Sequence, residues 1–151
     1  MTNANRTERP TIGFLSANIH IGASRVLWPG ILDAAAASDV NLICFPGGRL
    51  HAAESGEAMR NVIYQQVDSS QLSGLVIWTS ALAGAATADE VAEFHQAYHA
   101  IPLVDLASTT GHRPMVAIDG KQGMRALVEH LVEEHGYQRI SLIRWPESHP
   151  Y

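Results

Sequence analysis

Short apolar segments alternate with segments of helical periodicity along most of this 151-residue chain. The apolar segments have the length of β-strands, and strands that are apolar almost throughout are typical of a parallel sheet covered on both faces. The alternation therefore predicts right-handed βαβ units in a doubly wound, mainly parallel α/β sheet. The predicted strands are Thr11–Ser16, Val40–Phe45, Gly74–Trp78, Ile101–Leu106, Met115–Ile118 and Ile140–Arg144.

Four amphipathic helices are predicted between these strands. Pro29 lies in the first and removes a backbone donor, so that helix is either kinked there or begins near it. The third opens with a capping box, Thr87–Glu90, and the fourth has Asp119 as its N-cap and Gly136 as its stop. The side chains predicted to face inward are Val26, Leu27, Ile31 and Ala34 (helix at about Ser24–Ser38), Met59, Val62, Ile63 and Val67 (about Glu57–Val67), Val91, Phe94 and Tyr98, and Met124, Leu127, Val128, Leu131 and Val132.

The connection between the fourth and fifth predicted strands is short. Only Ala107–Pro114 intervenes, whereas a parallel crossover ordinarily contains a helix. The fifth strand is therefore expected either to run antiparallel to the fourth or to leave the sheet for a neighbouring structure. The second alternative places a subdomain boundary near Asp119.

Composition excludes several classes of function. The net charge of −5 and the absence of Lys or Arg runs offer nothing to nucleic acid or to an anionic membrane surface. Residues 1–10 are polar, so we expect a disordered tail there and no signal peptide. No apolar stretch reaches the roughly 20 residues of a membrane helix. The single cysteine, Cys44, rules out an internal disulfide, and a cytoplasmic location is the default expectation.

The candidate site residues lie beyond the carboxyl ends of predicted strands, where open α/β sheets bind ligands. In the loop Ala17–Ala23, Asn18 and His20 offer hydrogen-bonding groups, although an ordinary βα turn has the same composition. At the end of the third strand, the Trp78 indole can stack on a ligand, and the Thr79 and Ser80 hydroxyls can face one. A core tryptophan at a strand end fits the same residues.

The sequence holds no strong signal for phosphate or metal binding. The turn Pro46–Arg49 has the glycines of a phosphate-binding loop but neither a P-loop lysine nor GxGxxG spacing, so we expect an ordinary tight turn after the second strand. His95 and His99 have a spacing that can place two imidazoles on one metal. Because the apolar stripe of that helix already takes the buried face, we expect both histidines on its flank or solvent face, and no metal or cofactor.

Catalytic patterns are also missing. There is no GxSxG elbow, and Cys44 lies within a strand, where a buried inert thiol is expected. Asp105 and Asp119 follow or end strands and in principle support acid–base chemistry. An aspartate before a helix is ordinarily a cap, and a cap at a cleft rim also faces the ligand. We therefore expect no catalytic residue and no enzyme.

A series of motifs occurs in a specific order and spacing from about Thr11 to Tyr151. The segments are Thr11–Leu15, the polar loop to Gly22, Gly30–Ile31, Ser73–Ile77, Ile101–Val104, Val116–Asp119, Gly123, His130–Leu131 and His135–Ile140. Together they resemble the effector-binding domain of LacI/GalR-type transcriptional regulators. The fold of that family is the type I periplasmic-binding-protein fold, in which two α/β subdomains enclose a cleft.

The resemblance implies a division of the chain. Residues 11–118 would form the N-terminal subdomain, and Asp119 would be the first crossover between subdomains. Residues 119–151 would begin a C-terminal subdomain that is truncated here. Only the N-terminal part of the family domain is covered, and its helix-turn-helix headpiece is not, so no direct nucleic-acid contact is expected from this chain.

The resemblance also implies a function, the sensing of a sugar-like small-molecule effector by cleft closure. The family usually works as homodimers, so a homodimer is among the expected assemblies. Ligand contacts carried over by position are Ala17, Ile21, Ala23, Thr79 and Ala107, to which the residue-level reasoning adds Asn18, His20, Trp78 and Asp119.

Three other interpretations stay open. One is a headpiece-less sensor domain of a signalling protein such as a histidine kinase or diguanylate cyclase. Another is a flavodoxin-like nucleotide-binding domain or enzyme, which a phosphate-binding loop after the first strand would favour. The third is a truncated, nonfunctional product, which exposed apolar surface on the fourth predicted helix and on the predicted strand Ile140–Arg144 would support.

Overall fold

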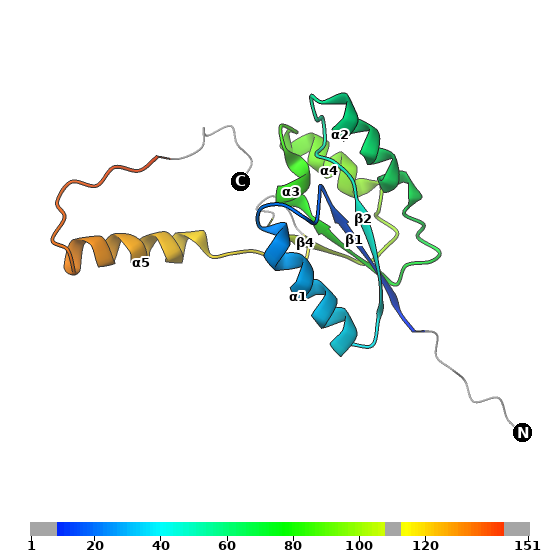
Figure 1. The fold of residues 1–151 in the computed structure, drawn as a ribbon, viewed down its shortest axis with the longest axis horizontal. Coiled ribbons are helices and arrows are strands. Elements are labelled where there is room, and N and C mark those ends of the chain that lie inside the picture. The colour runs from blue at the N-terminus through cyan, green and yellow to red at the C-terminus, as the bar shows by residue number, and fades with distance from the viewer. Residues whose placement is uncertain (1–8, 108–112, 144–151) are drawn as a thin grey trace, which may run out of the picture.

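The computed structural model describes residues 9–107 and 113–143. Five parallel strands form one sheet in the order β2-β1-β3-β4-β5 (Figure 1). The predicted doubly wound α/β class is therefore confirmed. The elements are β1 (Thr11–Ser16), α1 (Ser24–Ala37), β2 (Asn41–Pro46), α2 (Ser55–Arg60), the 3₁₀ helix η1 (Asn61–Gln66), β3 (Gly74–Trp78), α3 (Thr79–Ala83), α4 (Ala88–Gln96), β4 (Leu103–Leu106), β5 (Met115–Val116) and α5 (Gly120–Glu133).

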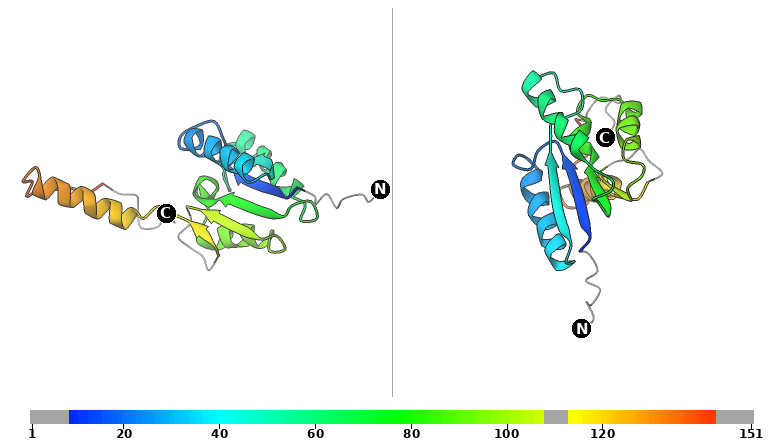
Figure 2. Two further views of the ribbon diagram at one scale, coloured as in Figure 1. Left: turned by 90° about the horizontal axis from the view of Figure 1, so that it is seen from below. Right: turned by 90° about the vertical axis from the view of Figure 1, so that its right-hand side faces the viewer.

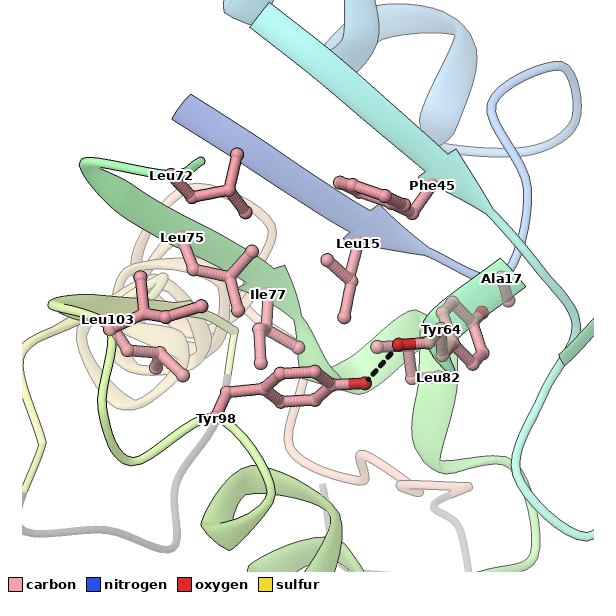
Figure 3. Packing of buried hydrophobic residues seen from close by; sticks show 11 residues of the cluster. Leu15, Ala17, Phe45, Tyr64, Leu72, Leu75, Ile77, Leu82, Tyr98 and Leu103 are labelled. Carbon is pink, nitrogen blue, oxygen red and sulfur yellow. Dashed lines mark hydrogen bonds between the residues drawn. The ribbon is translucent and has the colours of Figure 1, made fainter. Parts of the chain in front are cut away.

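The two faces of the sheet are covered by different helices (Figure 2). α1 lies on one face, where its Trp28 ring stacks on Phe14 of β1 with ring centroids 5.7 Å apart. η1, α3 and α4 lie on the other, over the main core (Figure 3). The buried members of that core are Leu15, Ala17, Phe45, Tyr64, Leu72, Leu75, Ile77, Leu82, Tyr98, Ile101 and Leu103. β1 lies between β2 and β3, and this central position explains why its residues from Gly13 onward are buried.

The first two helices differ from the prediction in which side chains face inward. α1 runs through Pro29 from Ser24, and Val26 and Ala34 are exposed although both were predicted inward. The Phe14–Trp28 stack sets the rotation of this helix, so its inward face is the row that contains Trp28. Val26 consequently points away from the row, with 81% of its surface exposed.

The predicted second helix, Glu57–Val67, is two elements. α2 ends at Arg60, and the chain continues as η1 with three residues per turn. Because this change of period rotates the residues after Arg60, Val62 is exposed rather than inward. Met59, in α2, was also predicted inward and is exposed. Tyr64 takes the buried position instead, while Ile63 and Val67 pack at the margin of the core as predicted.

Local capping signals were predicted correctly. The Thr87 hydroxyl accepts from the backbone N–H of Glu90, and the Glu90 carboxylate accepts from the backbone N–H of Thr87, so the capping box is complete. In α5, Asp119 Oδ1 accepts from the backbone N–H of Gln122 at 2.9 Å. Gly136 follows α5 with φ of +64°, a left-handed conformation that glycine adopts without strain.

The fifth strand contradicts the expectation from its short connection. β5 is parallel to β4 and in the same sheet, with Asp105 opposite Met115 and Leu106 opposite Val116. The physical reason is the short distance between the end of β4 and the start of β5. β4 has only four residues, or about 13 Å, and a connection of eight residues reaches about twice that far without a helix.

The chain leaves the sheet after β5, and α5 extends away from the body (Figures 1 and 2). Its apolar residues Met124, Leu127, Val128 and Val132 are exposed. The predicted strand Ile140–Arg144 was wrong over its described residues, since 140–143 form no strand there. A strand needs a partner for its backbone groups, and no described strand lies beside this segment. Arg144 and residues 1–8 of the predicted tail lie outside the described residues.

No helix within residues 9–107 and 113–143 is long and apolar enough to span a membrane.

Candidate functional site

A pocket of about 470 Å³ lies where α1 begins and where β3, β4 and β5 end. Parallel strands place their carboxyl ends at one edge of the sheet, and in the order 2-1-3-4-5 this edge carries the ligand crevice near the β1–β3 switch point. The pocket therefore occupies the expected position for a site in this fold. Its lining residues are Ala23, Val26, Leu27, Trp78, Ser80, Leu106, Ala107, Val116, Ala117 and Ile118.

The pocket wall is almost entirely apolar. Two lining side chains carry polar groups, and these already bind each other, since the Trp78 indole N–H donates to Ser80 Oγ at 2.9 Å. No charged side chain belongs to the described lining. Such a wall suits the apolar face of a ring, because a charged group buried there would lack a counter-charge.

Ala107 gives the pocket a strained backbone. It directly follows β4, its φ is +55°, and its N–H donates to the carbonyl oxygen of Val116 at 2.8 Å. Left-handed φ values are uncommon for residues other than glycine and concentrate at ligand sites. This conformation turns the chain at the pocket rim.

Three of the nine predicted ligand residues come together in this pocket, namely Ala23, Trp78 and Ala107. Thr79, the first residue of α3, is buried against His95 of α4 and does not line the pocket, and Ala17 belongs to the main core. His20 and Ile21 are exposed in the loop after β1. Asp119 caps α5 and lines a separate surface hollow with residues of that helix.

Asn18, in the same loop, has a structural role. Its Oδ1 accepts from the backbone N–H of Ile21 at 3.3 Å and from the hydroxyl of Ser24 at 3.1 Å. The backbone N–H groups of Ser24 and Arg25, at the start of α1, donate to carbonyl oxygens of the loop. The donors that would cradle a phosphate at this helix N-terminus are therefore already occupied.

The Pro46–Arg49 turn is also closed to ligands. The Gly48 N–H donates to Asn61 Oδ1 at 2.7 Å, and the Arg49 N–H donates to Glu57 Oε1 at 2.9 Å. Arg49 also pairs with Glu57 through its guanidinium, and these hydrogen bonds lower the pKa of Glu57 to about 2. The predicted interpretation as a tight turn agrees with this geometry.

A polar cluster that the sequence did not reveal lies behind the pocket wall. It consists of Thr79, His95 and Asp105, all three less than 10% exposed. His95 Nε2 lies 2.8 Å from Thr79 Oγ1 and 3.7 Å from Asp105 Oδ2. Asp105 Oδ1 has no hydrogen-bond partner among the described groups. His95 was expected on the flank or solvent face of its helix, and that expectation was wrong.

His95 is buried because two polar side chains lie opposite it at the sheet. Thr79 and Asp105 project from neighbouring strand ends toward α4, so the imidazole replaces part of its lost hydration there. His99 is exposed, and its Nδ1 lies 3.0 Å from the Gln96 carbonyl oxygen. The two histidines therefore do not share a face that could hold a metal. No group of three or more metal-ligating side chains occurs in the described part of the chain.

The cluster does not have the geometry of a catalytic triad. In a Ser–His–Asp triad the hydroxyl and the carboxylate contact different ring nitrogens. Here Thr79 and Asp105 both approach Nε2. Cys44 is no better as a nucleophile, because burial raises the pKa of its thiol to about 11.

Six lining residues were not predicted from the sequence, including Leu106, Val116 and Ile118. Leu106 and Val116 were predicted as strand residues, and their shared position followed only from the parallel pairing of β4 with β5. Ile118 looked like the end of a strand, whereas it is 91% exposed in the link to α5. Apolar residues at the outer ends of strands were the available signal.

Comparison with protein-family models, with curated proteins and with solved structures found no match for this chain.

Proposed function

We propose that this chain supplies one wall of a small-molecule sensing site of the LacI/GalR type. The observation that carries the proposal is the pocket between the start of α1 and the ends of β3 and β4. The chain leaves the sheet at the rim of this pocket, through Ala117 and Ile118, and continues into α5. A second lobe that begins with α5 would face the pocket and complete it.

The proposed ligand is a sugar-like effector that presents the apolar face of its ring to this wall. The Trp78 indole provides a flat surface for such a face, and Leu106 and Val116 extend it. The hydroxyl groups of a sugar need polar partners, which the second lobe would have to provide. The ligand would then bind both lobes together only when the cleft is closed.

Cleft closure is the proposed mechanism. A ligand that contacts both lobes binds the closed state more tightly than the open one and shifts the population toward it. The output is proposed to be transcriptional regulation in the cytoplasm, and a signalling output of a headpiece-less sensor uses the same mechanism. No catalytic step is part of this proposal.

The strand order also favours a second candidate, a flavodoxin-like nucleotide-binding domain. Nucleotide phosphates need free backbone N–H groups, commonly at the first helix N-terminus. In this chain Asn18 and the loop carbonyls occupy the donors of that region. The sensing function is therefore the better supported of the two.

A ligand screen by thermal shift tests the proposal on the domain completed with its second lobe, because this chain alone supplies one wall of the site. A ligand that binds only the native state at 100 times its Kd stabilises it by about 2.7 kcal/mol. We expect a shift with at least one monosaccharide or similar neutral ring compound. The shift should disappear in Trp78→Ala and persist in Val62→Ala, whose side chain is exposed and outside the pocket. Stabilisation by a flavin or nucleotide, with no response to neutral rings, would favour the second candidate instead.

A further inference from the structure

The Thr79–His95–Asp105 cluster lies directly behind the residues that line the pocket. Thr79 follows Trp78, and Asp105 precedes Leu106 and Ala107. Asp105 and Leu106 are successive residues of β4 and point to opposite faces of the sheet, and Thr79 is the first residue of α3, directly after β3. The pocket wall and the cluster therefore share the same short lengths of backbone. A movement of either strand end in the cluster therefore displaces the pocket wall.

His95 joins these two strand ends from α4. Its Nε2 lies within hydrogen-bonding distance of Thr79 Oγ1, at 2.8 Å, but not of Asp105 Oδ2, at 3.7 Å. The structure thus shows His95 bonded to the β3 end and separated from the β4 end. Asp105 Oδ1, which has no hydrogen-bond partner within residues 9–107 and 113–143, adds an acceptor that is unsatisfied in this arrangement.

The charged groups that act on His95 come from two elements. Asp105 of β4 favours the imidazolium, and Arg113, which precedes β5, disfavours it. Burial of the ring is the largest influence, and it lowers the pKa of His95 below the ordinary value of 6.5. The imidazole is therefore neutral near pH 7 and gains its proton at a lower pH than an ordinary histidine does.

Protonation of His95 favours a hydrogen bond to Asp105 over the one to Thr79. The imidazolium donates from both nitrogens, and a charge-assisted hydrogen bond to a carboxylate has a length of about 2.7–2.9 Å. To form it, Asp105 and His95 must approach each other by about 1 Å from their present separation. The backbone after Asp105 is already in a left-handed turn at Ala107, and it has to adjust to this approach.

We propose that the Thr79–His95–Asp105 cluster is a proton-operated switch that reshapes the pocket from behind. When His95 gains a proton, Asp105 moves onto it, and Leu106 and Ala107 follow. This inference goes beyond the proposed sensing function and does not depend on it, because the pocket wall moves whether or not an effector binds there.

Nuclear magnetic resonance of the full chain tests the switch as the pH is lowered from 7.5 through the titration of His95. The Trp78 indole N–H and the Ala107 amide report on the two strand ends, and the His95 ring reports on its own protonation. We expect all three to titrate with one midpoint below pH 6.5. His99→Gln is the matched control, since this exposed histidine lies one turn away, and it should leave the three titrations unchanged.

Two variants decide the outcome. His95→Gln should abolish the titration of the Trp78 and Ala107 signals. Asp105→Asn provides a second test if His95→Gln does not fold. In Asp105→Asn, His95 should titrate at lower pH because the favourable charge is gone, and the Ala107 signal should no longer follow it. The proposal fails if the Trp78 and Ala107 signals stay constant while wild-type His95 titrates, or if they titrate equally in either variant.

Discussion

The hydroxyl of Tyr64 lies 2.8 Å from the carbonyl oxygen of Gly48, in a buried position behind the turn that follows β2. The same hydroxyl lies 3.1 Å from the carbonyl oxygen of Ser16, at the end of β1. Burial raises the pKa of Tyr64 well above its ordinary value, so the phenol keeps its proton. One side chain from η1 thereby binds the carboxyl ends of two neighbouring strands.

Removal of this hydroxyl should destabilise the fold. In Tyr64→Phe the Gly48 carbonyl oxygen loses its donor in a buried place, which costs about 1–2 kcal/mol. Urea denaturation followed by circular dichroism measures the difference in the free energy of unfolding. Tyr137→Phe is the control, because Tyr137 is 55% exposed, and its unfolding free energy should match the wild type. Equal stability of Tyr64→Phe and the wild type would mean that water replaces the hydroxyl.

Two glycine substitutions should have opposite effects. A β carbon on Gly47 would overlap the ring of Tyr64, so Gly47→Ala should cost about 1–3 kcal/mol through overpacking. A β carbon on Gly30, within α1, meets nothing, and Gly30→Ala should add about 0.5–1 kcal/mol because alanine favours the helix. Thermal melting of both variants against the wild type checks the two signs. A stable Gly47→Ala would show that the Tyr64 ring can move aside.

Local sequence signals predicted much of this fold. The strands β1 and β3 have the predicted bounds, and the Thr87 capping box and the Asp119 cap form as expected. These features depend on neighbours within a few residues, such as an apolar run or a side-chain oxygen beside a free N–H. The rotation of α1 was not predictable in this way, because it depends on contact between Trp28 and Phe14 of another element.

The site was predicted only in part for the same reason. The rule that ligands bind beyond strand ends led to Trp78, and the family resemblance supplied Ala23 and Ala107; the three residues line one pocket. His95 was misplaced because an apolar stripe predicts which face is buried but not which polar partners lie beneath it. Thr79 and Asp105 are 26 residues apart in sequence and meet at His95 only after β3 and β4 pair.

The ion pair between Arg49 and Glu57 should make the free energy of unfolding depend on pH. The pKa of Glu57 is lowered from 4.5 to about 2 in the folded protein, so folding favours the ionised carboxylate. The resulting stability is present above pH 4.5 and is lost as the pH falls toward 2. Because Arg49 is largely exposed, the contribution should not exceed about 1 kcal/mol.

Glu57→Gln tests this pH dependence, since glutamine can still accept from the Arg49 N–H but carries no charge. The difference in stability between wild type and variant should be largest at pH 5–7. It should shrink to zero as the pH falls from 4.5 to 2. Melting temperatures across this range measure the gap. Arg49→Gln should lose as much, and the double variant should lose no more than either single one. Additive losses would mean that the two side chains act separately.

The position of α5 outside the body predicts a contrast between two leucines. Leu82 in α3 is fully buried in the main core, so Leu82→Ala should cost about 2–5 kcal/mol. Leu127 in α5 is 52% exposed, so Leu127→Ala should change the unfolding free energy of the body by less than about 0.5 kcal/mol. Urea titrations monitored by fluorescence of the tryptophans in α1 and β3 report on the body. A loss of several kcal/mol in Leu127→Ala would show that α5 packs onto the sheet in solution, and the division of the chain near Asp119 would then be wrong.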